Sequence, residues 1–141
     1  MMHNLTLLVS RILMAPIMVL YGIDKLADVN NFINNPATVR FMFLFAQGGV
    51  APMWFAYANA IFQLAIGMAV LVGFKTRVSA LLVVLWLIPV TYLGHPFWAG
   101  INPVFNEPQF YKNLAIIAAY LMIASFGAGR YSADGLLSDR R

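Results

Sequence analysis

The chain has 141 residues, of which 62% are hydrophobic and only 10% are charged. A soluble domain carries about 25% charged residues, so this composition excludes a soluble protein and predicts a single membrane domain, 1–141, whose solvent is the lipid bilayer. The absence of cysteine excludes thiolate catalysis, iron–sulfur ligation and cysteine-based zinc sites. The net charge of +4 is spread along the chain, so we interpret it as a topology signal and expect no nucleic-acid partner.

Long apolar runs predict the membrane-spanning elements. A bilayer core about 30 Å thick requires about 20 apolar residues in each spanning helix, and four runs of the chain reach or approach this length. We therefore predict an all-α, integral membrane four-helix bundle. Its helices are expected at about 5–26, 52–74, 78–94 and 109–127. The short connections favour an up-down-up-down topology.

Local signals refine these predictions in chain order. Asn4 or Thr6 is expected to cap the first helix. After a group of turn-forming asparagines and a proline, segment 37–46 is predicted to be a short interfacial helix within the first loop. Pro89 is expected to kink the third helix, and residues 94–109 are expected to form a loop.

Basic residues outside the helices predict the orientation of the bundle. In a four-span arrangement, five of them share a side with the N-terminus, and three lie on the other side. The five are Lys75, Arg77, Arg130, Arg140 and Arg141. Cytoplasmic segments are enriched in Lys and Arg, so we predict a multi-pass protein of a bacterial inner (plasma) membrane, with the N-terminus and the C-terminus inside. The first run lacks a basic leader, so we expect a retained helix.

Polar and small residues form one face on each of the first two predicted helices. They are Arg11, Gly22 and Lys25 in the first helix, and Asn59, Gln63 and Gly67 in the second. Such faces pack against other helices rather than against lipid. Two interpretations of Arg11 stay open: its guanidinium reaches the membrane interface, or it faces the bundle and binds an anionic or carbonyl group. Two interpretations of Gln63 also stay open: its side chain makes an interhelical hydrogen bond, or it makes a hydrogen bond to a ligand.

Further polar residues gather at the predicted outer ends of the third and fourth helices. His95 and Trp98 follow the third helix, and Lys112 and Asn113 open the fourth. They form either an ordinary aromatic belt with interfacial lysines or the mouth of a site for an anion or a quinone headgroup, in which His95 can change its charge near neutral pH. The candidate ligand-binding residues are Arg11, Lys25, Gln63, His95, Trp98, Lys112 and Asn113. We predict no catalytic triad and no metal site.

These residues resemble the motifs of the DoxX family of small four-helix membrane proteins, close to its YphA-like branch. The motifs follow in the same order along nearly the whole chain. They are Arg11 with Tyr21-Gly22-x-x-Lys25, Gly73-Phe74-x-Thr76-Arg77, Gly94-His95-x-Phe97-Trp98 and Phe110-Tyr111-Lys112-Asn113. The resemblance implies a link to membrane oxidoreductase assemblies, including a thiosulfate–quinone oxidoreductase whose membrane subunit belongs to this group. Similar proteins often carry Glu where Gln63 stands, so this chain lacks a carboxylate that could relay protons or pair with Arg11.

Two functional hypotheses follow. The first is a quinone- or small-anion-binding subunit of an electron-transfer system, which has no intrinsic cofactor but carries a bound quinone. In this hypothesis Arg11 and Lys25 supply positive charge. Gln63 donates a hydrogen bond to a carbonyl of the ligand, and His95 supplies a proton. The alternative is a non-enzymatic accessory or assembly subunit, packed beside a larger membrane protein complex or in a homo-oligomer. Its partner surface would be the aromatic residues of the first loop: Phe41, Phe43, Phe45, Trp54 and Phe55.

Overall fold

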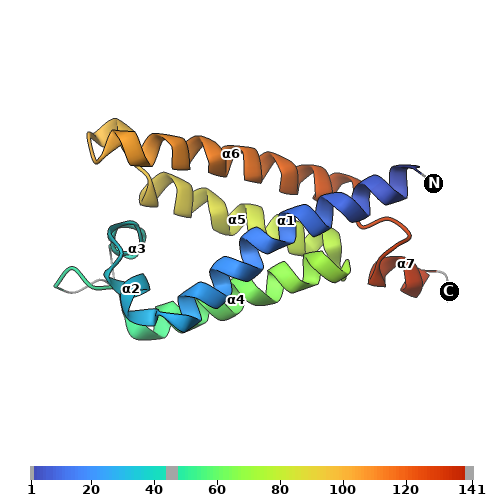
Figure 1. The fold of residues 1–141 in the computed structure, drawn as a ribbon, viewed down its shortest axis with the longest axis horizontal. Coiled ribbons are helices and arrows are strands. Elements are labelled where there is room, and N and C mark those ends of the chain that lie inside the picture. Colours follow the sequence, from blue (N-terminus) through green and yellow to red (C-terminus); the bar gives the residue numbers. More distant parts are fainter. Residues whose placement is uncertain (1, 44–47, 139–141) are drawn as a thin grey trace.

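The described part of the chain is helical and contains no strand, which confirms the all-α part of the prediction (Figure 1). The computed structural model describes residues 2–43 and 48–138. In chain order its elements are α1 (Met2–Ala27), α2 (Val29–Asn34), α3 (Pro36–Phe41), α4 (Met53–Val72), α5 (Thr76–Gly94), the 3-10 helix η1 (Phe97–Ala99), α6 (Pro103–Phe126) and α7 (Ala133–Ser138).

Three helical segments of the described chain are long and apolar enough to cross a membrane. They are α1, α4 and the segment Thr76–Ala99, which contains α5. The fourth long helix, α6, has 24 residues but is not among them. Its first half carries Glu107, Lys112 and Asn113, which lower the mean hydropathy of the helix although its second half is apolar.

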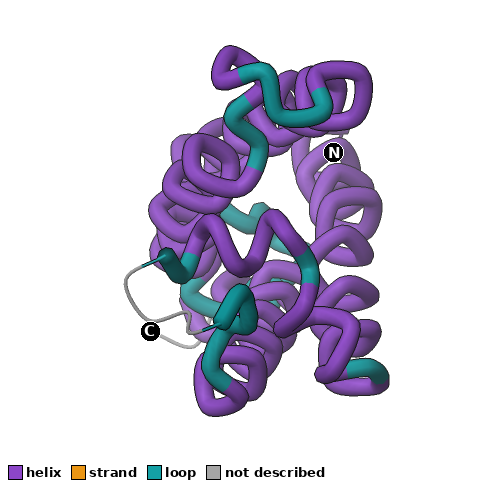
Figure 2. Tube along the Cα trace, turned by 90° about the vertical axis from the view of Figure 1, so that its left-hand side faces the viewer, coloured by secondary structure: helices purple, strands orange, loops and turns teal. Residues whose placement is uncertain are grey.

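The long helices pack in pairs. α1 lies along α4, α5 lies along α6, and the turn between Val72 and Thr76 joins the two pairs (Figure 1). The core forms where all four helices meet, and its most deeply buried members include Met18, Val70, Val83 and Tyr120. Figure 2 views the molecule from the end at which α2, α3 and the connection between α5 and α6 gather. These short elements therefore sit over one end of the helix pairs.

Two predicted helix starts are wrong, for different reasons. α1 begins at Met2, so neither Asn4 nor Thr6 caps it; the Asn4 side chain instead accepts a hydrogen bond from the backbone N–H of Arg130. α6 begins at Pro103, about two turns before the predicted start. Proline suits the first turn of a helix, where its missing N–H has no intrahelical partner. Residues 103–109 are therefore helical rather than part of a loop.

The first loop contains two short helices in place of the predicted single helix at 37–46. The Asn35 side chain accepts a hydrogen bond from the N–H of Ala37 and thereby caps α3, which ends at Phe41. The predicted continuation to residue 46 lies partly outside the described residues. Phe41 and Phe55 pack against each other with ring centroids 5.6 Å apart. This loop thus has a small apolar core of its own, in which Ile33, Met42 and Ala56 are buried.

The chain after α6 folds back onto the turn between α4 and α5. The Asp134 carboxylate accepts hydrogen bonds from the backbone N–H groups of Lys75, at 2.7 Å, and Thr76, at 2.8 Å. These N–H groups open α5, where a negative charge is favourable. The N–H of Asp134 also donates to the carbonyl oxygen of Gly73 at 2.9 Å. The segment that contains α7 is therefore docked against the turn between α4 and α5.

Candidate functional site

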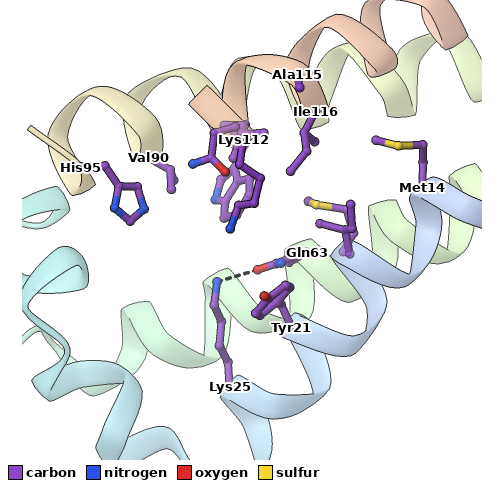
Figure 3. Close-up of a pocket in the computed structure, with 14 residues that line it drawn as sticks. Met14, Tyr21, Lys25, Gln63, Val90, His95, Lys112, Ala115 and Ile116 are labelled. Carbon is purple, nitrogen blue, oxygen red and sulfur yellow. Dashed lines mark hydrogen bonds between the residues drawn. The ribbon is translucent and has the colours of Figure 1, made fainter. Parts of the chain in front are cut away.

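A cavity of about 420 Å³ lies between α1, α4, α5 and α6 (Figure 3). Most of its wall is apolar, with methionine, isoleucine, leucine and valine side chains from three helices. Five of the seven predicted ligand-binding residues line it. These are Lys25, Gln63, His95, Lys112 and Asn113. The structure therefore brings together residues from four separate parts of the chain around one space.

Lys25 projects from the last turn of α1 toward α4. Its ammonium group donates hydrogen bonds to Gln63 Oε1 at 2.6 Å and to Asn59 Oδ1 at 3.0 Å. The same nitrogen lies 4.6 Å from the ring centroid of Phe32 and 5.2 Å from that of Trp86. All of these groups are neutral. Amide oxygens and aromatic faces stabilise the positive charge of Lys25 but do not neutralise it. The ammonium group can therefore still attract an electron-rich ligand in the cavity.

The polar and small faces of α1 and α4, each predicted to pack against another helix, meet each other in the structure. A Cβ atom added to Gly67 would lie 2.8 Å from the Cβ of Met18, and one added to Gly22 would lie 3.2 Å from the backbone nitrogen of Leu64. Both glycines therefore allow α1 and α4 to approach closely, the usual role of small residues in membrane helices. This close approach puts Lys25 within reach of Asn59 and Gln63.

His95 follows the last residue of α5 and lies at one end of the cavity (Figure 3). Its Nδ1 lies 3.0 Å from Asn106 Oδ1, and the Asn106 side-chain amide donates to the carbonyl of Ile101 at 2.6 Å. Because the nitrogen of that amide is engaged with a carbonyl, its oxygen acts as the acceptor, and Nδ1 is the protonated nitrogen. Nε2 is then the ring nitrogen left for a ligand.

The α6 side of the cavity carries a buried amide and an exposed lysine. Asn113 is 6% exposed. Lys112 lies at the exposed rim, where its ammonium donates to Gln109 Oε1, one turn earlier. Tyr21 and Ala115 are also exposed and line the cavity from α1 and α6. The cavity therefore opens sideways between these two helices.

Arg11 does not line the cavity, which corrects its predicted place in the ligand site. It faces the bundle and is 1% exposed. Its guanidinium donates to the carbonyl oxygen of Leu71 at 3.0 Å and to that of Tyr131. These acceptors lie at the end of α4 and in the docked C-terminal segment. Arg11 thus holds three segments together at the opposite end from Lys25, and Gln63 is a partner of Lys25 rather than of Arg11.

Trp98 also lies outside the cavity. It is 49% exposed and packs against Tyr92, Phe97 and Phe110, with the Tyr92 ring centroid 5.1 Å away. Tryptophan and tyrosine in such positions are typical of membrane interfaces. The aromatic-belt interpretation therefore fits Trp98.

Two residues that we did not select from the sequence contribute to the site. Trp86 lines the cavity, and its indole Nε1 is buried without a hydrogen-bond acceptor among the described residues. Asn106 orients His95. Trp86 lies inside an apolar run and resembles any other core residue there, whereas Asn106 stands in a segment predicted to be a loop. A buried indole donor is the only signal that could have marked Trp86, and it requires the structure.

Comparison with known proteins places the chain in a family. The DoxX family model matches residues 6–96. Inner membrane protein YphA of Escherichia coli (strain K12) is 27% identical over 132 residues, which cover 91% of this chain and 87% of that protein. Inner membrane protein YqjF of the same organism is 37% identical over 75 residues, or 52% of this chain and 55% of that protein. No solved structure matches the chain. Because the family match covers more than half of its length, the chain belongs to the DoxX family.

Proposed function

We propose that the protein is an integral inner-membrane protein whose cavity binds a quinone headgroup or a small anion, as a subunit of an electron-transfer system. The observation that carries this proposal is the environment of Lys25. Its ammonium lies in a mostly apolar cavity with two neutral amide acceptors, at 2.6 and 3.0 Å. A charge inside a membrane protein costs free energy unless it has partners. An anionic or carbonyl oxygen in the cavity would supply one.

The hydrogen-bonding groups of the cavity favour a ligand that accepts hydrogen bonds. Lys25 and Lys112 can only donate, and the buried Nε1 of Trp86 is a donor without an acceptor in the described chain. The amides of Gln63 and Asn113 can each donate as well. A quinone carbonyl or an oxyanion could accept a hydrogen bond from any of these groups. The apolar walls formed by Met18, Leu87 and Ile116 suit a ring or another apolar body.

The cavity size also supports a small organic ligand. Its volume of about 420 Å³ falls in the range of about 300–1,000 Å³ that is common for ligand pockets. His95, at one end, would exchange a proton with a bound headgroup through Nε2, while Asn106 holds the ring in place. Electrons would come from a partner protein, because quinone chemistry requires a donor and an acceptor.

The proposed membrane arrangement has four crossings with both termini inside. α6 would cross as the fourth helix, since it has 24 residues and packs along α5. Lys75, Arg77 and Arg130 would then share the inner side; the predicted contributions of Arg140 and Arg141 lie outside the described residues. The names of the relatives, both of which are inner membrane proteins of E. coli, support this location.

A direct test is to identify what the purified protein carries. The protein is extracted in mild detergent, and bound small molecules are measured by native mass spectrometry for the wild type, Lys25→Met and Lys75→Met. Lys75 is exposed and outside the cavity, so it serves as the matched control. We expect a quinone or an anion with the wild type and with Lys75→Met, and its loss in Lys25→Met. An equal content in all three proteins would contradict the proposal.

A second candidate is the accessory subunit. Two aromatic residues of the first loop region are strongly exposed, with Phe43 at 63% and Trp54 at 61%. Phe41 and Phe55 pack inside the loop instead, and the predicted contribution of Phe45 lies outside the described residues. The remaining aromatic surface is therefore smaller than predicted. A stable stoichiometric partner in the same detergent extract would favour this function.

A further inference from the structure

A second cavity, of about 430 Å³, lies along the same two helices as the rim of the first. It is lined by α1 residues between His3 and Met14 and by α6 residues between Ala119 and Phe126. Met14 lines both cavities. In Figure 3 this residue marks the end of the first cavity that lies farthest from His95. The two spaces thus follow each other along one seam between α1 and α6.

One hydrogen bond joins the helices at the middle of this seam. The Tyr120 hydroxyl of α6 donates to the carbonyl oxygen of Met14 at 3.1 Å, and Tyr120 is fully buried. The other long-helix neighbours are α4 for α1 and α5 for α6. This hydrogen bond therefore joins α1 to α6 at the middle of the seam, and one cavity lies on each side of it. Met14 is an unbranched, flexible side chain, which can move aside for a chain that passes between the cavities.

The two parts of the seam differ in chemistry. The end near Lys25 carries the lysine and amide donors. The second cavity has a largely apolar wall that includes Leu13, Met122 and Ile123, and its polar members are His3, Thr6 and Ser10. From Lys25 to His3 the helix axis spans about 33 Å at about 1.5 Å per residue. A headgroup or a free anion fills only the first cavity. A molecule that fills both has a polar head and a long apolar chain.

We propose that the ligand is a long-chain amphiphile, an isoprenoid quinone, whose head lies beside Lys25 and whose chain lies in the α1–α6 seam past Met14. The ligand enters sideways from the bilayer between Tyr21 and Ala115. This inference rests on the proposed headgroup site and adds the class of ligand and its route. In a bilayer the chain gains no hydrophobic free energy by leaving the lipid, so van der Waals packing against the shape of the seam supplies the binding free energy of the chain.

The test is to block the seam without touching the headgroup site. Ala119→Trp fills the second cavity, which Ala119 lines and the headgroup cavity does not share with it, while Ala118→Trp puts the same ring at a neighbouring, exposed position outside both cavities. Binding of a long-tailed and a short-tailed quinone is titrated in lipid nanodiscs. We expect Ala119→Trp to weaken binding of the long-tailed quinone by about tenfold or more, equivalent to about 1.4 kcal/mol. The short-tailed quinone should bind to Ala119→Trp as to the wild type, and Ala118→Trp should change the binding of neither quinone.

The outcomes separate the two proposals. If the wild type binds neither quinone, the headgroup site itself is refuted. If it binds both, and blocking the seam affects both equally or neither, the headgroup site stands and the seam proposal is overturned. A wild-type measurement guards against misfolded variants: a quinone with a photoreactive group at the end of its tail should label residues 3–14 and 119–126. Even labelling of all lipid-facing helix surfaces would overturn the seam.

Discussion

The ammonium nitrogen of Lys25 lies 2.6 Å from the amide oxygen of Gln63, and this contact joins α1 to α4 at the wall of the cavity. The partner is an amide, so the lysine charge is not neutralised by it. Both the stability of the α1–α4 pair and the attraction of the cavity for electron-rich oxygens therefore depend on the hydrogen bond between Lys25 and Gln63.

Substitutions at position 63 should change stability in opposite directions. Gln63→Leu leaves the Lys25 ammonium with one amide acceptor fewer and should lower the free energy of unfolding by about 1–3 kcal/mol. Gln63→Glu supplies a counter-ion at hydrogen-bond distance and should raise the unfolding temperature in detergent, while weakening binding of an anion or quinone. Thermal unfolding and ligand titration of both variants check this. Changes of the same sign in the two variants would contradict the assigned contact.

Gly67→Ala should loosen the contact between α1 and α4. The added Cβ would lie 2.8 Å from the Met18 Cβ and 3.0 Å from Val19 Cγ2, closer than side-chain carbons pack. Overpacking of this kind costs about 1–3 kcal/mol. Ala65→Val, which adds volume at an exposed position of the same helix, is the control. The idea fails if both variants unfold at the wild-type temperature in the same detergent.

Arg11→Lys should destabilise the protein, because a lysine cannot replace the guanidinium fork. Arg11 donates from two nitrogens to carbonyl oxygens of Leu71 and Tyr131, and a lysine nitrogen cannot reach both in the same geometry. We expect a loss of about 1–3 kcal/mol and faster trypsin cleavage near Arg130. Arg77→Lys, at an exposed position, should be neutral in both measurements. A neutral Arg11→Lys would mean that the two carbonyl contacts contribute little.

The docking of α7 should be sensitive to acid. Burial favours the neutral form of Asp134, but hydrogen bonds from Thr76 and Lys75 and the charge of Arg11 outweigh burial and hold its pKa below the ordinary value of 3.8. A lowered folded pKa contributes stability that is fully present above the ordinary value and is lost as the pH falls through the lowered one. Wild-type unfolding temperature should therefore drop below about pH 4, with a smaller drop in Asp134→Asn. Identical acid profiles for the two proteins would exclude this role.

Single cysteines can report the proposed orientation, because the chain has no cysteine of its own. Ala99→Cys and Ser138→Cys place a thiol at exposed positions on opposite sides of α6 in the sequence. With four crossings and both termini inside, a membrane-impermeant maleimide should label position 99 in cells with a permeabilised outer membrane. It should label position 138 only after the inner membrane is opened. Labelling of both positions before that step would mean that α6 does not cross.

Helix periodicity correctly predicted that the polar faces of α1 and α4 turn toward other helices, and in the structure they face each other. Arg11, Gly22 and Lys25 share one face of α1, and this face meets the stripe that contains Gln63. The sequence also predicts that polar residues gather at the adjoining ends of the third and fourth helices, and His95 and Asn113 line one cavity there. Both predictions rest on side-chain patterns that a sequence displays directly.

The partners of Arg11 could not be predicted in the same way. They are backbone carbonyls, of Leu71 and Tyr131, and a sequence gives no sign of which carbonyl lies near a given side chain. The same holds for Trp86, whose position in the cavity wall depends on the packing of α5 against α4 and α6. The predicted loop at 94–109 is wrong in its second half, because prolines often mark loops, whereas α6 begins at Pro103 and continues through Pro108.

The most direct test uses Trp86, which lies in the cavity wall, as a reporter. In a Trp54→Phe, Trp98→Phe background, Trp86 is the remaining tryptophan of the chain, and quinones quench tryptophan fluorescence on contact. We predict saturable quenching by a quinone in lipid nanodiscs, and its loss when Lys25→Met is added to a protein that remains folded by thermal unfolding. Quenching that rises without saturation as the quinone fraction of the lipid increases, and that is unchanged by Lys25→Met, would contradict a headgroup site in this cavity.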